Sequence, residues 1–118
     1  MQNASLEAIT DVEDDVLIVT LRGDIDGSAR EALNVAYAKV GECTAILLDF
    51  SGVEYINSTG IAVIVGLLAR ARADSLPISA RGLSPHYREI FEVTRLCDFM
   101  TILAADDPSP TGRSGAAR

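Results

Sequence analysis

One apolar stretch, Ala45-Ile46-Leu47-Leu48-Asp49-Phe50, restricts the fold more than any other part of the sequence. A strand with one face in water alternates apolar and polar residues, whereas this run is almost continuously apolar. It therefore predicts a strand covered on both faces, as in a parallel or mixed sheet with helices packed on it. Ser51-Gly52 follows directly and is expected to end the strand.

The N-terminal part of the chain predicts a hairpin. Residues 16–21 are apolar and rich in β-branched side chains, and they predict a mostly buried strand that ends at Arg22-Gly23. The acidic pair Asp14-Asp15 before this strand predicts a turn. A short strand at residues 6–10 is therefore expected to pair with it.

Residues 23–28 predict a loop, in which Asp26 or Ser28 could cap the following helix. The later elements follow from apolar periodicity and from turn residues. They are a helix at 29–40 ended by Gly41, a helix at 58–73, a strand at 78–80, a helix from Ser84-Pro85 to Thr94, and a strand at 99–103. The prediction is an α/β fold with a mixed sheet of four to five strands and helices packed on it. We expect residues 1–104 to form one domain and residues 105–118, which lack core-forming side chains, to form a flexible tail.

The formal net charge of -7 argues against nucleic acid and against an anionic membrane surface as partners, because both attract clustered Lys and Arg. An acidic chain suits a basic patch on another protein, although many acidic proteins are merely soluble. Cys43 and Cys97 have no CxxC spacing and predict two buried free thiols, not a disulfide or a zinc site. The N-terminus lacks a signal-peptide pattern, and the apolar run at 61–69 is too short to span a membrane. We expect a cytoplasmic protein.

No arrangement of residues in the sequence predicts an enzyme. His86 is the single histidine, and its place just after Ser84-Pro85 predicts the surface of a helix. The sequence has neither a glycine-rich phosphate loop nor a cluster of metal ligands. Asp24 and Asp26 are paired carboxylates without a catalytic partner, so turn and capping roles are expected. No catalytic residue, metal or cofactor is predicted.

Asn57-Ser58-Thr59-Gly60 joins a strand to a helix, and this junction has two interpretations. In the first, Asn57 or Ser58 only caps the helix. In the second, Ser58 accepts a phosphate, because a helix N-terminus exposes unpaired N–H groups and carries partial positive charge. A phosphate at that place would be stabilised by the local field and would leave the domain folded.

Three segments together resemble the STAS domain of bacterial anti-sigma factor antagonists. The first, Leu21 to Asp26, is similar to the family's strand followed by Gly-acidic-apolar-Asp. The second is Ile46 to Val53 followed by Ile56 to Gly60, which is similar to the family's most characteristic region. The third combines Ser84-Pro85, Phe91 and Val93-Thr94-Arg95-Leu96, which resemble the family's helix and its close. The resemblance covers residues 6 to 104.

The resemblance implies a protein that captures an anti-sigma factor, itself a serine kinase with a GHKL-type ATP site, and so frees the sigma factor. The kinase then phosphorylates the serine that aligns with Ser58, the complex dissociates, and a PP2C-type phosphatase restores the serine. ATP and magnesium would belong to the kinase. The partner-binding residues implied by the resemblance are Asp24, Asp26, Asn57, Ser58, Thr59, Gly60 and Val63.

Two positions depart from the family pattern. The family usually has Asp before the phosphoacceptor serine, where this chain has Asn57, which can cap a helix but carries no charge. The usual glycine near the close is replaced by Arg95. Thr59 is a second candidate acceptor, although a β-branched residue there is expected to support the turn. Asn57 motivates a second hypothesis, a STAS scaffold or interaction module without phosphorylation, as in a stressosome-like assembly or beside a transporter.

Overall fold

The structure is a computed structural model that describes residues 6–103, so the tail predicted at 105–118 lies outside the described residues. Five strands form one sheet in the order β1-β2-β3-β4-β5. β1 and β2 are antiparallel, and β2 to β5 are parallel to their neighbours. The strands are β1 (Glu7–Glu13), β2 (Val16–Ile25), β3 (Ala45–Ile56), β4 (Ile78–Arg81) and β5 (Thr101–Ile102). The predicted α/β fold with a mixed sheet is confirmed.

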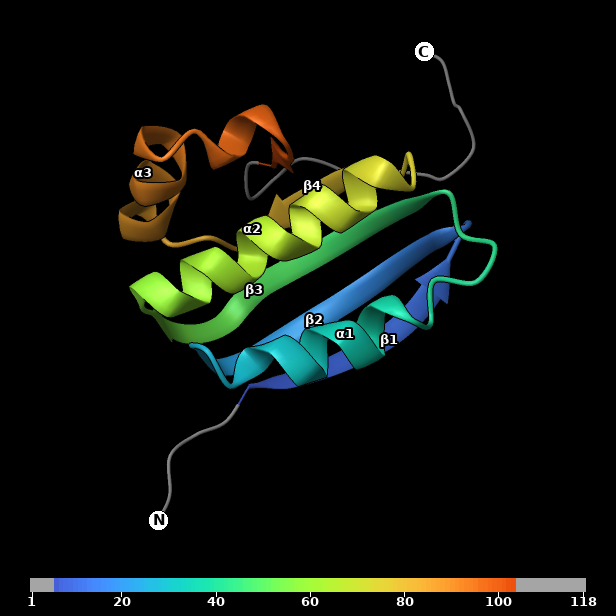
Figure 1. Ribbon diagram of the computed structural model, residues 1–118, viewed down its shortest axis with the longest axis horizontal. Helices are drawn as coiled ribbons and strands as arrows, with labels where there is room; N and C mark the ends of the chain where they lie inside the picture. Colours follow the sequence, from blue (N-terminus) through green and yellow to red (C-terminus); the bar gives the residue numbers. More distant parts are fainter. Residues whose placement is uncertain (1–5, 104–118) are drawn as a thin grey trace.

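Three helices connect the parallel strands: α1 (Ala29–Tyr37), α2 (Ser58–Ala73) and α3 (Pro85–Val93). A short 3-10 helix, η1 (Leu96–Asp98), precedes β5. α1 and α2 lie side by side over the same face of the sheet and start at the same end of the molecule (Figure 1). Within the described part of the chain, no helix is long and apolar enough to cross a bilayer.

The alternation of side chains along β3 builds a core on both faces of the sheet. Leu48 points into the main core beneath the helices and is 1% exposed. Leu47 points the other way and is 0% exposed, in a smaller cluster with Val16, Ala45 and Leu103. Burial of this part of the strand on both faces, as predicted from the unbroken apolar run, is confirmed.

The carboxyl ends of β2 and β3 extend further than predicted. β3 does not end at Ser51-Gly52 but continues to Ile56, because its second half pairs with Arg22 to Ile25 across shifts in register. A Cβ atom on Gly52 would lie 2.9 Å from the Leu21 carbonyl oxygen, so glycine permits this close approach. β2 likewise continues past Gly23, so Asp24 lies in a strand and not in a loop.

Other boundaries differ in smaller ways. The Asp14-Asp15 turn is confirmed, with φ of 53° and 65°, but β1 spans Glu7–Glu13 instead of 6–10. α1 ends at Tyr37 and not at residue 40, because the N–H groups of Lys39 and Val40 bond carbonyls three residues back in tighter turns. β5 is reduced to two residues, since Phe99 belongs to the turn that ends η1. The two cysteines, Cys43 and Cys97, are half-buried, not buried as expected.

A polar contact joins the C-terminal ends of α1 and α2. Tyr37 is 5% exposed, and its hydroxyl donates a hydrogen bond to Oδ2 of Asp74. The guanidinium of Arg70 lies 4.2 Å from the centroid of the Tyr37 ring. Burial, together with the hydrogen bond to Asp74, raises the pKa of Tyr37 to about 12. The neutral phenol therefore links the two helices.

Tyr37→Phe is expected to remove the part of the protein's stability that is lost when Tyr37 ionises at alkaline pH. Tyrosine in an unfolded chain has a pKa of about 10, so the stability contributed by neutral Tyr37 is complete below that pH. It is lost as the pH rises through the folded pKa of about 12. At pH 7 the variant should lose about 1 kcal/mol with the hydrogen bond. Urea unfolding of both proteins from pH 7 upward should show this difference shrinking above about pH 10; a constant difference would contradict the expectation.

Candidate functional site

Ser58 is the first residue of α2, and its side chain is exposed. Asn57 before it is the N-cap residue, with an extended backbone, and its Oδ1 accepts the Gly60 N–H at 2.7 Å. Asn57 therefore makes the cap, and Ser58 does not. Among residues 6–103, no hydrogen bond engages the Ser58 hydroxyl. The hydroxyl is chemically accessible at the start of the helix.

The end of β2 and the loop that follows it pack directly against the start of α2. The Ile25 carbonyl accepts the Asn57 N–H at 3.2 Å. A Cβ atom on Gly60 would lie 1.9 Å from the same carbonyl oxygen, so only glycine permits this contact. A Cβ atom on Gly27 would lie 2.9 Å from Cγ2 of Thr59. The chain segment of Asp24 and Asp26 is therefore held against the helix that begins with Ser58.

Asp26 organises the turn before α1. Its Oδ1 accepts hydrogen bonds from the Ser28 hydroxyl and from the Ser28 N–H, and its carbonyl accepts the Ala29 N–H at 3.0 Å. The bond from the Ser28 hydroxyl, followed by that from the Ser28 N–H, lowers the pKa of Asp26. Ser28 occupies the N-cap position but makes no capping bond with its side chain. Neither Asp26 nor Ser28 therefore caps α1 with its side chain, and the Asp26 carboxylate instead fixes the turn that precedes the helix.

Asp24 is half-buried and is aligned with Tyr55 of β3 in the parallel register. Tyr55 is 55% exposed, so an aromatic ring stands at the surface beside this carboxylate. The sequence analysis missed Tyr55 because it ended the strand at Ser51-Gly52. If the predicted strand had been extended to Ile56, the alternation of buried and exposed side chains along it would have placed Tyr55 at the surface, next to the buried Ile56.

α3 contacts the junction between β3 and α2 through a hydrogen bond to the last residue of β3. The Tyr87 hydroxyl accepts the N–H of Ile56, the last residue of β3, at 2.9 Å. α3 begins as predicted, with Pro85 in its first turn and Ser84 Oγ accepting the Tyr87 N–H at 3.2 Å. His86 is exposed at the helix surface, also as predicted. α3 thereby fixes the strand end immediately before Asn57.

Two of the expected partner contacts are not at the surface. Val63 is 4% exposed and belongs to the main core, so that expectation is corrected. Gly60 is buried against Ile25. α2 is apolar on all sides, so periodicity alone could not separate its inner face from its outer face. The side chains exposed on the first two turns are Ser58, Thr59, Ala62 and Val65.

Within the described ranges, no group of three or more His, Cys, Asp or Glu is placed to hold a metal.

Residues 9–103 match the protein family described as Mlab, STAS domain. The chain belongs to the STAS domain family. It is 32% identical over 104 residues to the anti-sigma-B factor antagonist of Listeria monocytogenes, which covers 85% of this chain and 89% of the relative. It is 30% identical over 84 residues to the putative anti-sigma factor antagonist BtrV of Bordetella bronchiseptica, covering 69% of this chain and 72% of BtrV.

Solved structures of anti-sigma factor antagonists share this fold. An anti-sigma factor antagonist from Mycobacterium paratuberculosis has a TM-score of 0.66 at 24% identity, covering 83% of this chain and 85% of that protein. The anti-sigma factor antagonist SpoIIAA in its unphosphorylated form has a TM-score of 0.64 at 18% identity, and the match covers 86% of this chain and 89% of SpoIIAA. The phosphorylated form of SpoIIAA from Bacillus has a TM-score of 0.62 at 20% identity, and the match covers 81% of this chain and 90% of SpoIIAA.

Proposed function

We propose that this STAS protein is a cytoplasmic anti-sigma factor antagonist that binds a GHKL-type serine-kinase anti-sigma factor. Phosphorylation of Ser58 by this kinase dissociates the complex, and a PP2C-type phosphatase removes the phosphate again. The observation that carries the proposal is the exposed Ser58 hydroxyl at the first position of α2, free because Asn57 makes the cap. The relatives named as anti-sigma factor antagonists support the same class of function.

The geometry around Ser58 suits a switch that acts without unfolding the domain. Asn57 Oδ1 accepts the hydrogen bond of the Gly60 N–H. Within residues 6–103, the N–H groups of Ser58 and Thr59 have no hydrogen-bond acceptor. A phosphate on Ser58 would meet these donors and the positive end of the helix dipole. It would also add a charge of about -1.5 to -2 to a surface that already carries Asp24 and Asp26. A partner fitted to the neutral serine would then face repulsion and a desolvation cost.

Asn57 favours a second candidate, a STAS scaffold without a phosphorylation cycle. The Asn57 side chain is neutral and its Oδ1 is occupied by the cap, so it offers no general base beside Ser58. In the leading proposal, the kinase must therefore supply the group that accepts the serine proton.

The test compares Ser58→Asp, Ser58→Ala and Thr59→Ala, with the exposed neighbour Thr59 as the matched control. The purified host kinase is incubated with each protein and magnesium-ATP, the modified residue is read by mass spectrometry, and affinity is measured by calorimetry. Ser58→Asp should bind at least tenfold more weakly, which is about 1.4 kcal/mol. Ser58→Ala should bind persistently, and Thr59→Ala should still be phosphorylated.

Equal affinity of Ser58→Asp and the unmodified protein would disprove the switch. Retained binding without modification of Ser58 would favour the scaffold. Failure of the kinase to bind any of the proteins would disprove the proposed partner.

A further inference from the structure

The outer surface of α2 beyond its first turn is low and apolar. We call the exposed residues Ala62, Val65, Gly66, Ala69 and Ala73 the α2 ridge. A Cβ atom on Gly66 would meet no atom within 4 Å, so the space above the helix is open there. Val65 is 46% exposed at the side of the ridge that faces η1. Small side chains along a helix let the backbone of a second helix come close.

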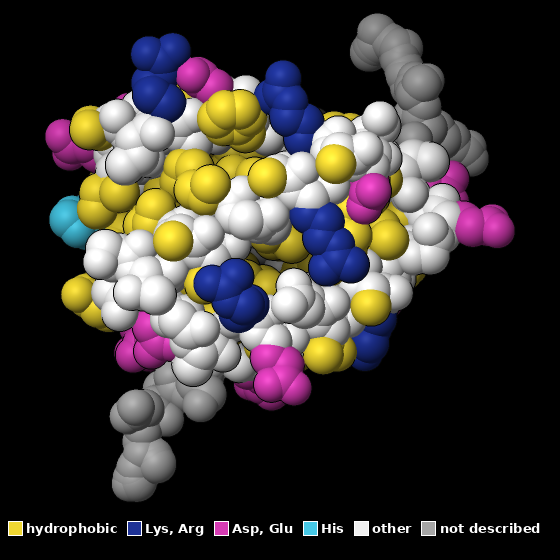
Figure 2. Space-filling view, in the orientation of Figure 1, with side chains coloured by type: hydrophobic (Ala, Val, Ile, Leu, Met, Phe, Trp, Pro, Cys, Tyr) yellow, Lys and Arg dark blue, Asp and Glu magenta, His cyan; other side chains and the backbone are white. Residues whose placement is uncertain are grey.

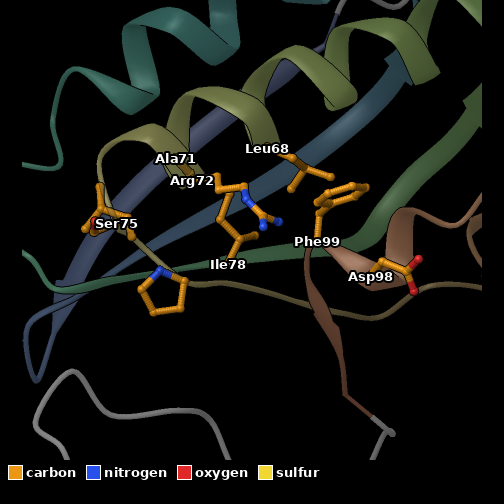
Figure 3. A pocket seen from close by; sticks show the side chains of 9 residues that line it. Leu68, Ala71, Arg72, Ser75, Ile78, Asp98 and Phe99 are labelled. Carbon is orange, nitrogen blue, oxygen red and sulfur yellow. The ribbon is translucent and has the colours of Figure 1, made fainter.

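Two arginines flank the ridge, and an aromatic ring holds each of them. On the α1 side, Arg70 lies 4.2 Å from the centroid of the Tyr37 ring. On the η1 side, Arg72 lies 5.3 Å from the centroid of the Phe99 ring, and Figure 3 shows it extending from α2 toward that ring. Within residues 6–103, neither arginine forms an ion pair. Because stacking fixes these long side chains in advance, less conformational entropy is lost when they bind an anion.

A groove runs along each side of the ridge. The groove beside η1 has a volume of about 240 Å³ and an apolar lining that includes Val65, Leu96 and the half-exposed Phe99. The groove beside α1 is smaller, about 110 Å³, and is bordered by Arg30 and Arg70. Figure 2 shows hydrophobic side chains gathered on this face, with Lys and Arg side chains around them. The surface therefore combines apolar hollows with positive charge.

We propose that the α2 ridge and its two grooves form a docking surface for an acidic amphipathic helix of a protein partner. The chain carries a net charge of -7, yet this face presents Arg30, Arg70 and Arg72. Carboxylates on the incoming helix pair with Arg70 and Arg72, and its apolar side chains fill the groove beside Phe99. The positive charge of this face favours an acidic partner over a second copy of the chain, which would bring the same arginines into the interface.

The docking surface goes beyond the proposed switch, because it uses the outer side of α2 and not its N-terminus. The test is a titration of the ¹⁵N-labelled full-length protein followed by NMR. Two synthetic helical peptides with the same apolar face are used, one flanked by Glu and one by Lys. The Glu peptide should shift the amide signals of Val65, Gly66, Ala69 and Phe99, and the Lys peptide should not.

The double variant Arg70→Glu, Arg72→Glu should weaken binding of the Glu peptide at least tenfold. The matched control is Lys39→Glu with Arg22→Glu, which changes the charge equally at exposed positions off the ridge and should bind within twofold of the parent. Ser58→Asp should also leave peptide binding unchanged, so a failure here is separate from a failure of the phosphorylation switch. The amide spectrum of each variant, recorded without peptide, verifies folding.

Several results would overturn the docking surface. They are shifts confined to the surroundings of Ser58, equal binding of both peptides, no binding of the Glu peptide, and equal loss of binding in the control pair. Shifts of ridge amides on dilution without peptide would identify a second copy of the chain as the occupant and would overturn it as well.

Discussion

Gly60→Ala should destabilise the protein by about 3 kcal/mol, the upper range for overpacking a buried site. The new Cβ atom would lie 1.9 Å from the Ile25 carbonyl oxygen and 2.6 Å from its carbon. Both are backbone atoms, so no side-chain rotation relieves the clash, and α2 must move away from the end of β2. That movement also breaks the hydrogen bond from the Asn57 N–H to the same oxygen.

Gly66→Ala on the same helix is the matched control. A Cβ atom there meets no atom within 4 Å, and alanine is favoured over glycine in a helix interior by about 1 kcal/mol. Urea unfolding followed by circular dichroism should therefore move the two midpoints in opposite directions. A Gly60→Ala protein as stable as the parent would show that α2 and the end of β2 are not in contact. Loss of stability in both variants would point to a general effect of alanine.

The parts of the fold that were predicted correctly carry strong local signals. The unbroken apolar run at residues 45–50 gave the buried centre of β3, and Leu47 and Leu48 are buried on opposite faces. Ser84-Pro85 gave the start of α3, where Ser84 Oγ accepts a backbone N–H in the first turn. Each of these signals depends on residues close together in the sequence, so no knowledge of distant contacts was needed.

The errors arose where distant segments decide the outcome. Ser51-Gly52 is a strand-ending signal locally, but pairing with β2 carries β3 on to Ile56. That extension brings Tyr55 beside Asp24, an arrangement that no local pattern contains. Val63 was included among the partner contacts because of the resemblance, and only the packing of the helix on the sheet shows that it is buried.

Arg95 shows how a residue that departs from the family pattern can still fit its backbone. The resemblance predicts glycine near the close of the fold, and Arg95 has a φ of 67°, in the left-handed region that favours glycine. Its Nε donates to Oδ2 of Asp98 at 2.9 Å in an exposed ion pair. Arg95 therefore adopts, in the turn between α3 and η1, a backbone conformation that glycine adopts more readily.

Phe91→Ala should destabilise the protein by about 3–5 kcal/mol, the usual cost of removing a buried phenylalanine ring. Phe91 is 0% exposed, and its ring packs edge-to-face on Phe50 with centroids 5.8 Å apart. It is the buried residue of α3, so the helix would lose its anchor to the sheet. Val93→Ala is the matched control, because that side chain is 75% exposed on the same helix, and it should change stability by less than about 0.5 kcal/mol.

Loss of the anchor should also affect the start of α2, where Ser58 lies. α3 binds the end of β3 through the Tyr87 hydroxyl, which accepts the N–H of Ile56 two residues before Ser58. Native-state hydrogen exchange should therefore show faster exchange of the Ile56 amide in Phe91→Ala, while Val93→Ala keeps the parent rate. Unchanged protection of that amide in a destabilised Phe91→Ala protein would mean that α3 does not hold the junction. Faster exchange would make α3 the element through which the core holds the junction between β3 and α2 in place.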